Sequence, residues 1–235
     1  MIAVAGMVGS GKSTLAHALA GRFGLNLALE SVDDDNPWLQ LFYADAEHRK
    51  RYALHLQLHF LASRFRSMRQ MRGKGGSWVL DRTWYEDAEV FVGGLAEQGL
   101  LTPLEHGLYQ RLYAELLHSP AARPPRLLIY LHGPLDAMVQ RIETRGRATE
   151  QGVERDYWAR LHRRYQEWIR RFRHCPVLPL DVTEYDIVRD PQAIEEIAAL
   201  VRLRLEGELP QTDLWPAVPR RPHGSQLGLS PGHEP

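Results

Sequence analysis

The chain has 235 residues, 44% of them hydrophobic, and its 29 Lys and Arg residues balance its 29 Asp and Glu residues. A chain of this length and apolar content can fold as one globular domain, with or without a tail. The zero net charge gives no reason to expect a nucleic-acid polymer or a membrane as partner, so any charge-based function must be local. No apolar run reaches the roughly 18 residues that a membrane span needs. The single cysteine, Cys175, cannot form an internal disulfide and favours a reducing compartment, the cytoplasm.

Short apolar or β-branched runs alternate with longer helical patterns along the chain. The runs predict strands over 2–5, 27–30, 78–81, 127–131 and 177–180, and the longer patterns predict helices over 12–22, 37–47, 50–72, 85–98, 102–118, 135–146, 154–173 and 191–206. This alternation favours an α/β fold, a parallel five-stranded sheet with helices on both faces. From residue 208 the sequence is rich in Pro, Gly and Ser. We therefore expect a folded domain over 1–207 and a disordered tail over 208–235.

The first predicted strand runs directly into GMVGSGKST, which fits the phosphate-loop pattern G-x-x-x-x-G-K-[ST]. The matching residues are Gly6, Gly11, Lys12 and Ser13. The glycines let the backbone N–H groups turn towards phosphate oxygens. In such loops the lysine reaches the β- and γ-phosphates and the serine hydroxyl ligates Mg²⁺. Because a strand precedes the loop and an amphipathic helix follows it, the sequence predicts nucleotide binding.

The second predicted strand ends at Glu30, shortly before three consecutive acids, Asp33, Asp34 and Asp35. Ligands of parallel sheets bind at the carboxyl ends of the strands, so Glu30 should face the transferred phosphate. The three aspartates are better explained as caps of the helix that begins near Pro37. A carboxylate at Glu30 suits a neutral hydroxyl acceptor, whose proton it can take, and repels a phosphorylated one. This favours a nucleoside or another alcohol over a nucleoside monophosphate.

The helix predicted over 50–72 carries an apolar stripe with a polar face beside it. The stripe consists of Leu54, Leu58, Leu61, Phe65 and Met68 and should face the core. Gln57, Phe60 and Arg64 share the neighbouring face. An amide, an aromatic ring and a guanidinium together could read the edge of a base, although an ordinary exposed polar face explains this pattern better when it is taken alone.

The third predicted strand ends in LDRTWYEDAEVF, which places Asp81 and Arg82 at its carboxyl edge. Asp81 could support Mg²⁺ or its water ligands, and Arg82 could hold the reacting end of the acceptor. The alternative is a structural Asp–Arg pair.

The segment RIETRGRATEQG, residues 141–152, places Arg141 and Arg145 one helical turn apart. Gly146 should break the helix, so that Arg147 approaches from a different direction. Three guanidinium groups could then converge on a polyphosphate. A solvated basic helix end is the alternative.

Five segments, in this order, resemble the motifs of the deoxynucleoside kinase family: GMVGSGKST, Glu30, LHLQLHFLASRF, DRTWYEDAEVF and RIETRGRATEQG. The resemblance extends from residue 1 to about 188, and NPWL together with Asp81 resembles the bacterial deoxyadenosine and deoxyguanosine kinases. It implies a P-loop kinase fold with a short arginine-rich lid, ATP as phosphoryl donor with Mg²⁺, and the 5′-hydroxyl of a deoxynucleoside as acceptor. It also implies a homodimer joined through long helices, and Leu104, Leu108, Leu112 and Leu116 on the helix 102–118 are compatible with such an interface or with an internal core.

The resemblance also implies roles for individual residues. The catalytic residues would be Glu30 as general base on the 5′-hydroxyl, Asp81, Arg82 and Lys12, with Mg²⁺ held by Ser13 and Asp81. The donor would be bound by the phosphate loop, the lid and the loop LDVTEYD, through Gly6, Gly9, Gly11, Lys12, Ser13, Thr14, Arg141, Arg145, Arg147, Glu184, Tyr185 and Asp186. The deoxynucleoside would be bound by Glu30, Leu39, Phe42, Tyr43, Gln57, Arg64, Arg82, Asp87, Phe91 and Glu150.

Within the acceptor set, the resemblance implies that Gln57 and the Arg64–Asp87 pair read the base. Phe91 would stack on it, and Tyr43 with Glu150 would hold the sugar 3′-hydroxyl. Tyr43 lies a few residues further ahead of Gln57 than in animal members of the family, and Trp84 is bulkier than the small aliphatic residue often found at its position.

The Arg64–Asp87 pair resembles enzymes for deoxyadenosine, deoxyguanosine or deoxycytidine, and we expect a purine deoxynucleoside as the acceptor. The alternatives are a deoxycytidine-preferring kinase, a nucleoside monophosphate kinase and a regulatory nucleotide-binding protein. A switch-type GTPase would carry an N-K-x-D motif, and the sequence has none.

Overall fold

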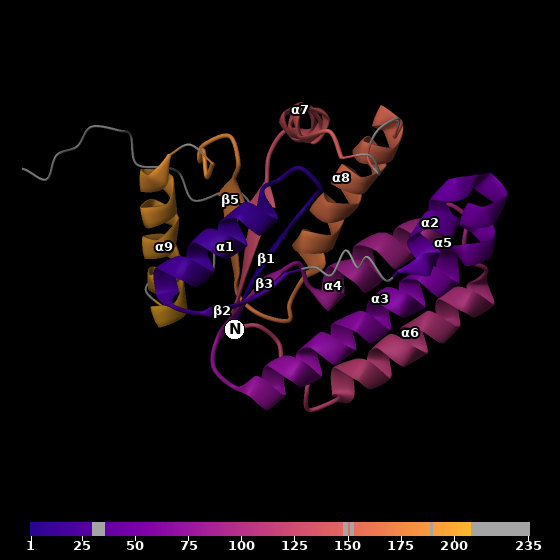
Figure 1. The fold of residues 1–235 in the computed structure, drawn as a ribbon, viewed down its shortest axis with the longest axis horizontal. Helices are drawn as coiled ribbons and strands as arrows, with labels where there is room; N and C mark the ends of the chain where they lie inside the picture. Colours follow the sequence, from indigo (N-terminus) through magenta and orange to yellow (C-terminus); the bar gives the residue numbers. More distant parts are fainter. Residues whose placement is uncertain (30–35, 148–149, 151–152, 189, 208–235) are drawn as a thin grey trace, which may run out of the picture.

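The computed structural model of the chain describes residues 1–29, 36–147, 150, 153–188 and 190–207. Its centre is a five-stranded parallel sheet in the order β2-β3-β1-β4-β5 (Figure 1). The strands are β1 (Ile2–Gly6), β2 (Asn26–Ala28), β3 (Trp78–Asp81), β4 (Leu127–His132) and β5 (Val177–Asp181). Because β1 lies in the middle, the loop that follows it opens at the carboxyl edge of the sheet between the ends of β3 and β4.

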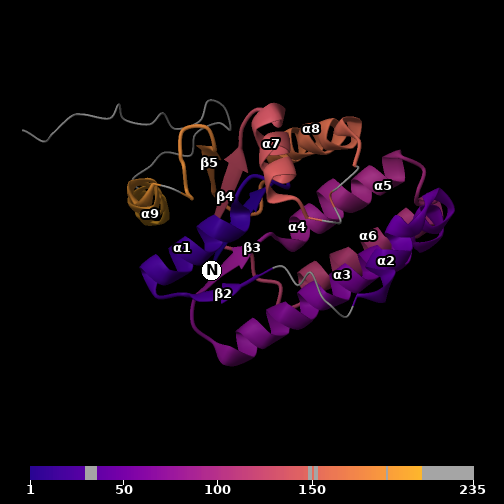
Figure 2. The same cartoon turned by 45° about the horizontal axis from the view of Figure 1, so that its top comes forward.

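Helices cover both faces of the sheet, as the alternating pattern predicted. They are α1 (Lys12–Phe23), α2 (Pro37–Ala44), α3 (Ala46–Lys74), α4 (Trp84–Glu86), the π-helix η1 (Asp87–Val92), α5 (Gly93–Glu97), α6 (Pro103–His118), α7 (Leu135–Arg145), α8 (Arg155–Arg171) and α9 (Pro191–Glu206). Figures 1 and 2 show α1 and α9 together on one side of the strands and α3, α6 and α8 on the other. The α/β class and the parallel sheet are therefore confirmed.

The second strand is shorter than predicted. It pairs with β3 only as far as Ala28, opposite Leu80, and Leu29 already lies outside the strand and is 47% exposed. As an edge strand, β2 has β3 as its one neighbour in the sheet. Glu30 lies outside the described residues, so its expected place at the strand end is untested.

The helix near Pro37 is capped by a residue other than those expected. The side chain of Asn36 accepts a hydrogen bond from the backbone N–H of Trp38 at 3.1 Å, so Asn36 is the N-cap of α2. This corrects the assignment of the cap to the aspartates 33–35, which lie outside the described residues. A short amide at the Ncap position can bond an N–H that has no partner within the helix.

The break between α2 and α3 also differs from the prediction. It falls at Asp45, whose side chain accepts a hydrogen bond from the N–H of His48 at 2.8 Å and so starts α3. The predicted apolar stripe is only partly correct: Leu61 and Met68 are buried, whereas its other members are half-buried at the edge of the core. Gln57, expected beside the stripe, is only 5% exposed.

The single helix predicted over 85–98 is three short helices. A capping box between Thr83 and Glu86 starts α4, the chain then winds as the six-residue π-helix η1, and α5 follows. Apolar periodicity carries no signal for this change of winding, because a π-turn depends on tertiary contacts.

The leucines of α6 do not form an internal core. Leu104, Leu108 and Leu112 are 85%, 42% and 42% exposed, whereas Tyr109 and Tyr113 point inward and are buried. This excludes the internal-core alternative for these three leucines. Within the described part of the chain, none of the helices combines the length and apolarity needed to cross a membrane.

Candidate functional site

The loop after β1 has the geometry of a phosphate cradle. Gly9 and Gly11 have φ angles of 81° and 91°, in a region that side chains rarely adopt. A Cβ atom on Gly9 would lie 2.6 Å from the carbonyl oxygen of Met138, because the loop is closed against α7. The Lys12 ammonium lies inside the loop and donates to the carbonyl oxygens of Gly6 (2.8 Å) and Met7 (2.9 Å). The sequence motif therefore folds as it does in nucleotide-binding proteins.

Ser13 and Asp81 meet beside this loop. The Ser13 hydroxyl donates to Asp81 Oδ2 at 2.5 Å, although the two residues belong to different elements. Asp81 is 4% exposed, and its other oxygen, Oδ1, is buried without a hydrogen-bond partner among the described residues. A hydroxyl and a carboxylate with spare acceptor capacity fit Mg²⁺, which takes few protein oxygens and completes its shell with water and phosphate.

Arg82 is held in a strained backbone conformation next to this pair. Its φ angle is 73°, and among the described residues it is the one non-glycine residue with positive φ. Its guanidinium lies 4.7 Å from the ring centroid of Phe91 and donates to the hydroxyl of Tyr165 at 3.3 Å. Such strain persists only where the surroundings fix the residue, and it is concentrated at functional sites.

Glu86 is a buried carboxylate that the sequence analysis did not single out. Its Oε1 accepts hydrogen bonds from the N–H of Gly6 (3.3 Å) and the hydroxyl of Tyr165 (3.0 Å), and its Oε2 accepts from the N–H of Thr83 (2.8 Å). Burial raises the pKa of Glu86, and the nearby Arg82 guanidinium opposes that shift. The spacing T-x-x-E signals the cap of α4, but only the fold shows that this carboxylate also ties the phosphate loop to Arg82 through Tyr165.

The residues expected to read the base also come together. Arg64 Nε lies 2.8 Å from Asp87 Oδ2, and their side chains are only 14% and 8% exposed. A buried pair of this kind is costly to break, because either charge alone would be left in a low-dielectric environment. Phe91 lies edge-on to Tyr165, with ring centroids 6.3 Å apart. Both Asp87 of the ion pair and Phe91 lie on η1.

A cavity of about 840 Å³ joins the phosphate loop to this group. Of the residues predicted from the sequence, its walls contain Gly9, Gly11, Lys12, Ser13, Thr14, Leu39, Phe42, Tyr43, Gln57, Asp81, Arg82, Asp87, Phe91, Arg145, Arg147 and Glu150. Its volume lies within the ordinary range of about 300–1,000 Å³ for small-molecule sites. Trp84 is buried against Tyr85 and is not part of the cavity wall.

The cavity also contains residues that the sequence analysis missed, among them Arg49, Tyr157 and Arg164. Burial raises the pKa of Tyr157 to about 12, and Tyr43 and Arg82 lie close enough to contribute to that shift. Tyr157 and Arg164 lie on α8, seven residues apart. Two turns of α8 therefore line this wall. In the sequence, a spacing of seven residues is also typical of ordinary core packing, so it did not mark these residues as part of a site.

The arginine-rich segment makes contacts within the protein. Gly146 ends α7 with a φ angle of 64°, and Arg145 donates to both carboxylate oxygens of Glu150, at 2.5 and 2.7 Å. Arg141 does not line the cavity; it donates to the carbonyl oxygen of Val182 at 2.9 Å, in the loop after β5. Thus Arg145 and Glu150, predicted for two different ligands, contact one another.

The other predicted residues that the structure describes lie outside the cavity wall. Gly6 supports the loop from behind, and Arg64 reaches the cavity through Asp87. Tyr185 is 3% exposed and packs in the core, whereas Glu184 and Asp186 lie beside it in the loop after β5. Glu30 lies outside the described residues.

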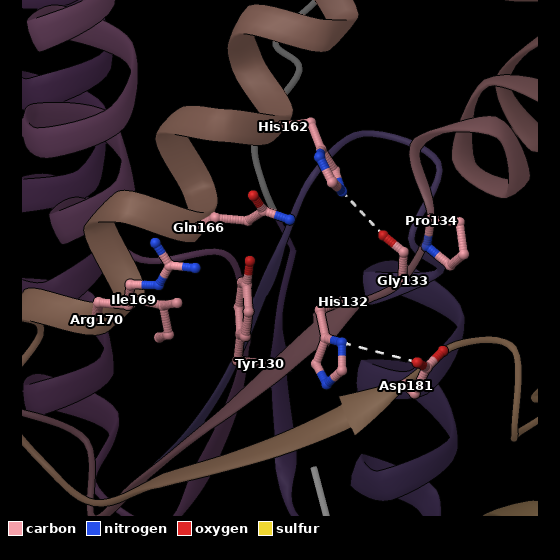
Figure 3. A pocket seen from close by; sticks show the side chains of 9 residues that line it. All are labelled: Tyr130, His132, Gly133, Pro134, His162, Gln166, Ile169, Arg170 and Asp181. Atoms are coloured by element: carbon pink, nitrogen blue, oxygen red, sulfur yellow. Dashed lines mark hydrogen bonds and ion pairs between the residues drawn. The ribbon is translucent and has the colours of Figure 1, made fainter. Parts of the chain in front are cut away.

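A second cavity, of about 280 Å³, lies where β4, β5 and α8 meet (Figure 3). The ring of His162 contacts the carbonyl oxygen of Gly133 at 2.9 Å, and His132 Nδ1 lies 4.0 Å from Asp181 Oδ2. Burial lowers the pKa of His132, against the opposing effect of Asp181. The cavity contains none of the residues predicted from the sequence, and its polar groups support the connection from β4 to α7.

Comparison with known proteins places this geometry in context. A family model described as deoxynucleoside kinase matches residues 2–205. The chain is 42% identical to the deoxyadenosine/deoxycytidine kinase of Bacillus subtilis (strain 168) over 197 residues, which cover 84% of this chain and 89% of the relative. It is 35% identical over 213 residues to a deoxyguanosine kinase of Lactobacillus johnsonii (strain CNCM I-12250 / La1 / NCC 533), covering 88% and 92%. A solved structure of deoxyadenosine kinase from M. mycoides with bound dATP is similar with a TM-score of 0.73 and 25% identity, covering 86% of this chain and 98% of that one.

Proposed function

The chain belongs to the deoxynucleoside kinase family, and from this premise we propose that it transfers the γ-phosphoryl group of ATP to the 5′-hydroxyl of a deoxynucleoside. The observation that carries the proposal is the cavity of about 840 Å³, which has Lys12 at its phosphate end and Gln57 with Asp87 at the other. Because one cavity contains both the phosphate end and the base end, the donor and the acceptor can meet in line within it. Positioning of this kind supplies much of the rate enhancement in phosphoryl transfer.

On the donor side, the chain offers positive charge around the expected γ-phosphate. Lys12 lies within the phosphate loop, and Arg145 and Arg147 line the same cavity. The transition state is loose and spreads negative charge over the transferred group, so these cations stabilise it more than the ground state. Ser13 and Asp81 would hold Mg²⁺, which would supply positive charge that neutralises part of the charge on the phosphates.

On the acceptor side, we propose Glu30 as the base that accepts the proton of the 5′-hydroxyl. Glu30 follows the edge strand β2 in the sequence, and the carboxyl end of β2 lies at the same edge of the sheet as Asp81 and Arg82. Arg82, between Phe91 and Tyr165, would orient the reacting end of the sugar.

For the base, we propose deoxyadenosine as the preferred acceptor and deoxycytidine as the second. Both bases present an exocyclic amino group beside a ring nitrogen. Side-chain amides pair with adenine, and carboxylates accept from the amino group of cytosine. Gln57 and Asp87 offer these two chemistries in one pocket. The names of two relatives, deoxyadenosine/deoxycytidine kinase and deoxyadenosine kinase, support these two acceptors, and the deoxyguanosine kinase among the relatives keeps deoxyguanosine as the other purine candidate.

The test is to incubate the protein with ATP, Mg²⁺ and each of the four deoxynucleosides and to measure the monophosphates formed. We expect product with deoxyadenosine, less with deoxycytidine and least with thymidine. Product with none of the four overturns the proposal. Turnover of dAMP or dTMP instead identifies a nucleoside monophosphate kinase, and ATP hydrolysis without an acceptor product identifies a regulatory protein.

We also propose that residues 1–207 form the kinase domain and that the chain acts in the cytoplasm as a homodimer. The family match ends at residue 205, just before Gly207 ends α9. The lone Cys175 has a partly buried thiol, whose pKa burial raises to about 12, which suits a reducing compartment but not a catalytic role. The exposed leucines of α6 are the surface that we assign to the dimer.

A further inference from the structure

The π-helix η1 carries two residues proposed to contact the base, Asp87 and Phe91. A π-turn closes its hydrogen bonds from residue i to i+5, so it is wider than an α-turn and is found mostly at functional sites. The width of the turn sets the angle between successive side chains. The relative directions of Asp87 and Phe91 therefore depend on whatever holds the chain in this winding.

One side chain from another element lies across this turn. Arg164 of α8 donates from Nε to the carbonyl oxygen of Val90 at 2.8 Å and from Nη2 to that of Glu89 at 3.3 Å. Its remaining nitrogen, Nη1, forms an ion pair with Glu97 of α5. The Arg164 side chain is 15% exposed, so these bonds are largely shielded from water. Only a planar guanidinium can present three nitrogens in this fixed arrangement.

Two glycines make room for this arginine. A Cβ atom on Gly93 would collide with Nη2 of Arg164, and one on Gly94 would lie 3.1 Å from its Nε. Both glycines are helical, with ordinary φ angles, so neither is required by its backbone conformation. A side chain on Gly93 would therefore have to displace the Arg164 guanidinium.

The same stretch of α8 also contacts the stacking ring. Tyr165, next to Arg164, lies edge-on to Phe91 at 86° between ring planes, and its hydroxyl donates to Glu86 at 3.0 Å. Thus α8 holds η1 through its backbone carbonyls and through the ring that faces the cavity.

We propose that Arg164 is a specificity-determining positioning residue, which fixes the π-turn and so sets the directions of Asp87 and Phe91 towards the base. The inference rests on the proposed function, because it assumes that these two residues contact the acceptor. Arg164 acts on the acceptor end of the cavity only. The phosphate loop has its own supports in Glu86 and α7. Loss of the Arg164 contacts to η1 should therefore change recognition of the base but not of ATP.

The test compares Arg164→Met and Arg164→Lys with the wild-type protein in steady-state kinetics on deoxyadenosine, deoxycytidine and deoxyguanosine. Lysine keeps the charge but cannot bond two carbonyls in one plane. We expect kcat/KM for the preferred deoxynucleoside to fall by roughly 10- to 100-fold in both variants, mainly through KM, as expected for lost charge-assisted hydrogen bonds. The ratio of kcat/KM between bases should shrink, and KM for ATP should change by less than about twofold.

Three further variants separate this role from a general effect on folding. Gly94→Ala leaves the guanidinium intact but pushes against its Nε, and it should shift base selectivity in the same direction. Glu97→Gln removes the ion pair and keeps both carbonyl bonds, so it should retain wild-type selectivity. Arg163→Met, at the exposed neighbouring position of α8, is the matched control and should behave as wild type.

Two outcomes would overturn the proposal. One is an equal loss of kcat for all bases with unchanged selectivity, and the other is a lower melting temperature with unchanged kinetics in the folded variants. Failure of the proposed function looks different, because the wild-type protein itself would then phosphorylate none of the deoxynucleosides.

Discussion

At the scale of single residues, buried charge links the two halves of the site. The Glu86 carboxylate accepts hydrogen bonds from Gly6 on one side and Tyr165 on the other, and Tyr165 in turn accepts from Arg82. The phosphate loop and the residue expected at the reacting hydroxyl are therefore connected by three consecutive bonds. Networks of this kind are rigid when every member is satisfied, and removing one member disturbs all of them.

Replacing Glu86 with Gln tests this link. The amide keeps the shape of the side chain but turns one acceptor into a donor, which faces either Thr83 or Gly6. We expect kcat to fall by about 100-fold, the scale of a misplacement of about 1 Å, and KM for the deoxynucleoside to change much less. Tyr165→Phe, which removes one bond of the network, should show a smaller effect in the same direction. Wild-type kcat in Glu86→Gln would contradict a positioning role.

A second buried group gives a prediction of pH dependence. Burial lowers the pKa of His132 from its ordinary value of 6.5, so the folded protein resists protonation there. When the pH falls below about 6.5, the unfolded chain binds a proton at this histidine that the folded chain does not. The free energy of unfolding should therefore decrease as the pH falls from 6.5 towards the lower folded pKa, and it should be insensitive to this group above 6.5.

The measurement is denaturant unfolding at pH 5.5 and at pH 7.5 for the wild type and His132→Gln. The variant should lose less stability between the two pH values, because the titrating group is gone. His118→Gln is a suitable control, since His118 is exposed near the end of α6. An equal pH dependence for the wild type and His132→Gln would show that His132 titrates normally in the folded protein.

At the scale of elements, the phosphate loop and α7 are closed against each other. The carbonyl oxygen of Met138 in α7 lies where a side chain on Gly9 would begin, and the φ angle of Gly9 is 81°. Gly9→Ala should open this contact, raise KM for ATP by at least about tenfold and lower the melting temperature, because a non-glycine residue in this conformation costs about 1–2 kcal/mol. Gly21→Ala is the control: Gly21 lies in α1 with open space around it, so alanine should stabilise the protein.

Helices and strands could be predicted where local sequence patterns determine them, and not where contacts with distant residues do. The apolar runs located all five strands: burial of β1, β3, β4 and β5 leaves a local pattern, and the partly buried edge strand β2 still carries a short apolar run. By contrast, η1 could not be predicted, because its winding is held by Arg164, more than 70 residues away in the sequence. The cap of α2 at Asn36 was missed for a smaller reason: three acids and an amide compete for the same role, and local propensity ranks them almost equally.

The site likewise contains residues that the local sequence identifies and residues whose roles depend on contacts with other elements. Its motif residues were recognisable because phosphate chemistry demands particular residues at fixed spacings, and the structure lines one cavity with most of them. Glu86, Tyr157 and Arg164 were not recognisable, because their roles depend on contacts with other elements. The roles of the motif residues themselves stay predictions for the experiments above.

At the scale of the whole molecule, the outer face of α6 carries a stripe of exposed leucines. Leu104 is 85% exposed, and Leu108 and Leu112 follow it at successive turns of the same helix. We propose this stripe of exposed leucines as an association site. Beneath the stripe, α6 packs on α3, which carries Gln57 and Arg64, so association here would also stiffen the wall that reads the base.

The double substitution Leu104→Glu with Leu108→Glu should therefore dissociate the protein. We expect the wild type to sediment as a dimer at micromolar concentration and the variant as a monomer, because the added carboxylates would face each other or apolar surface in the interface. Gln110→Glu adds one carboxylate on α6 away from the leucines and should leave the dimer intact. The cavity described above is lined within one chain, so the monomer should still phosphorylate deoxynucleosides, with a higher KM if α6 stiffens α3. A wild-type protein that is monomeric at every concentration, or a double variant that still dimerises, would exclude α6 as the interface.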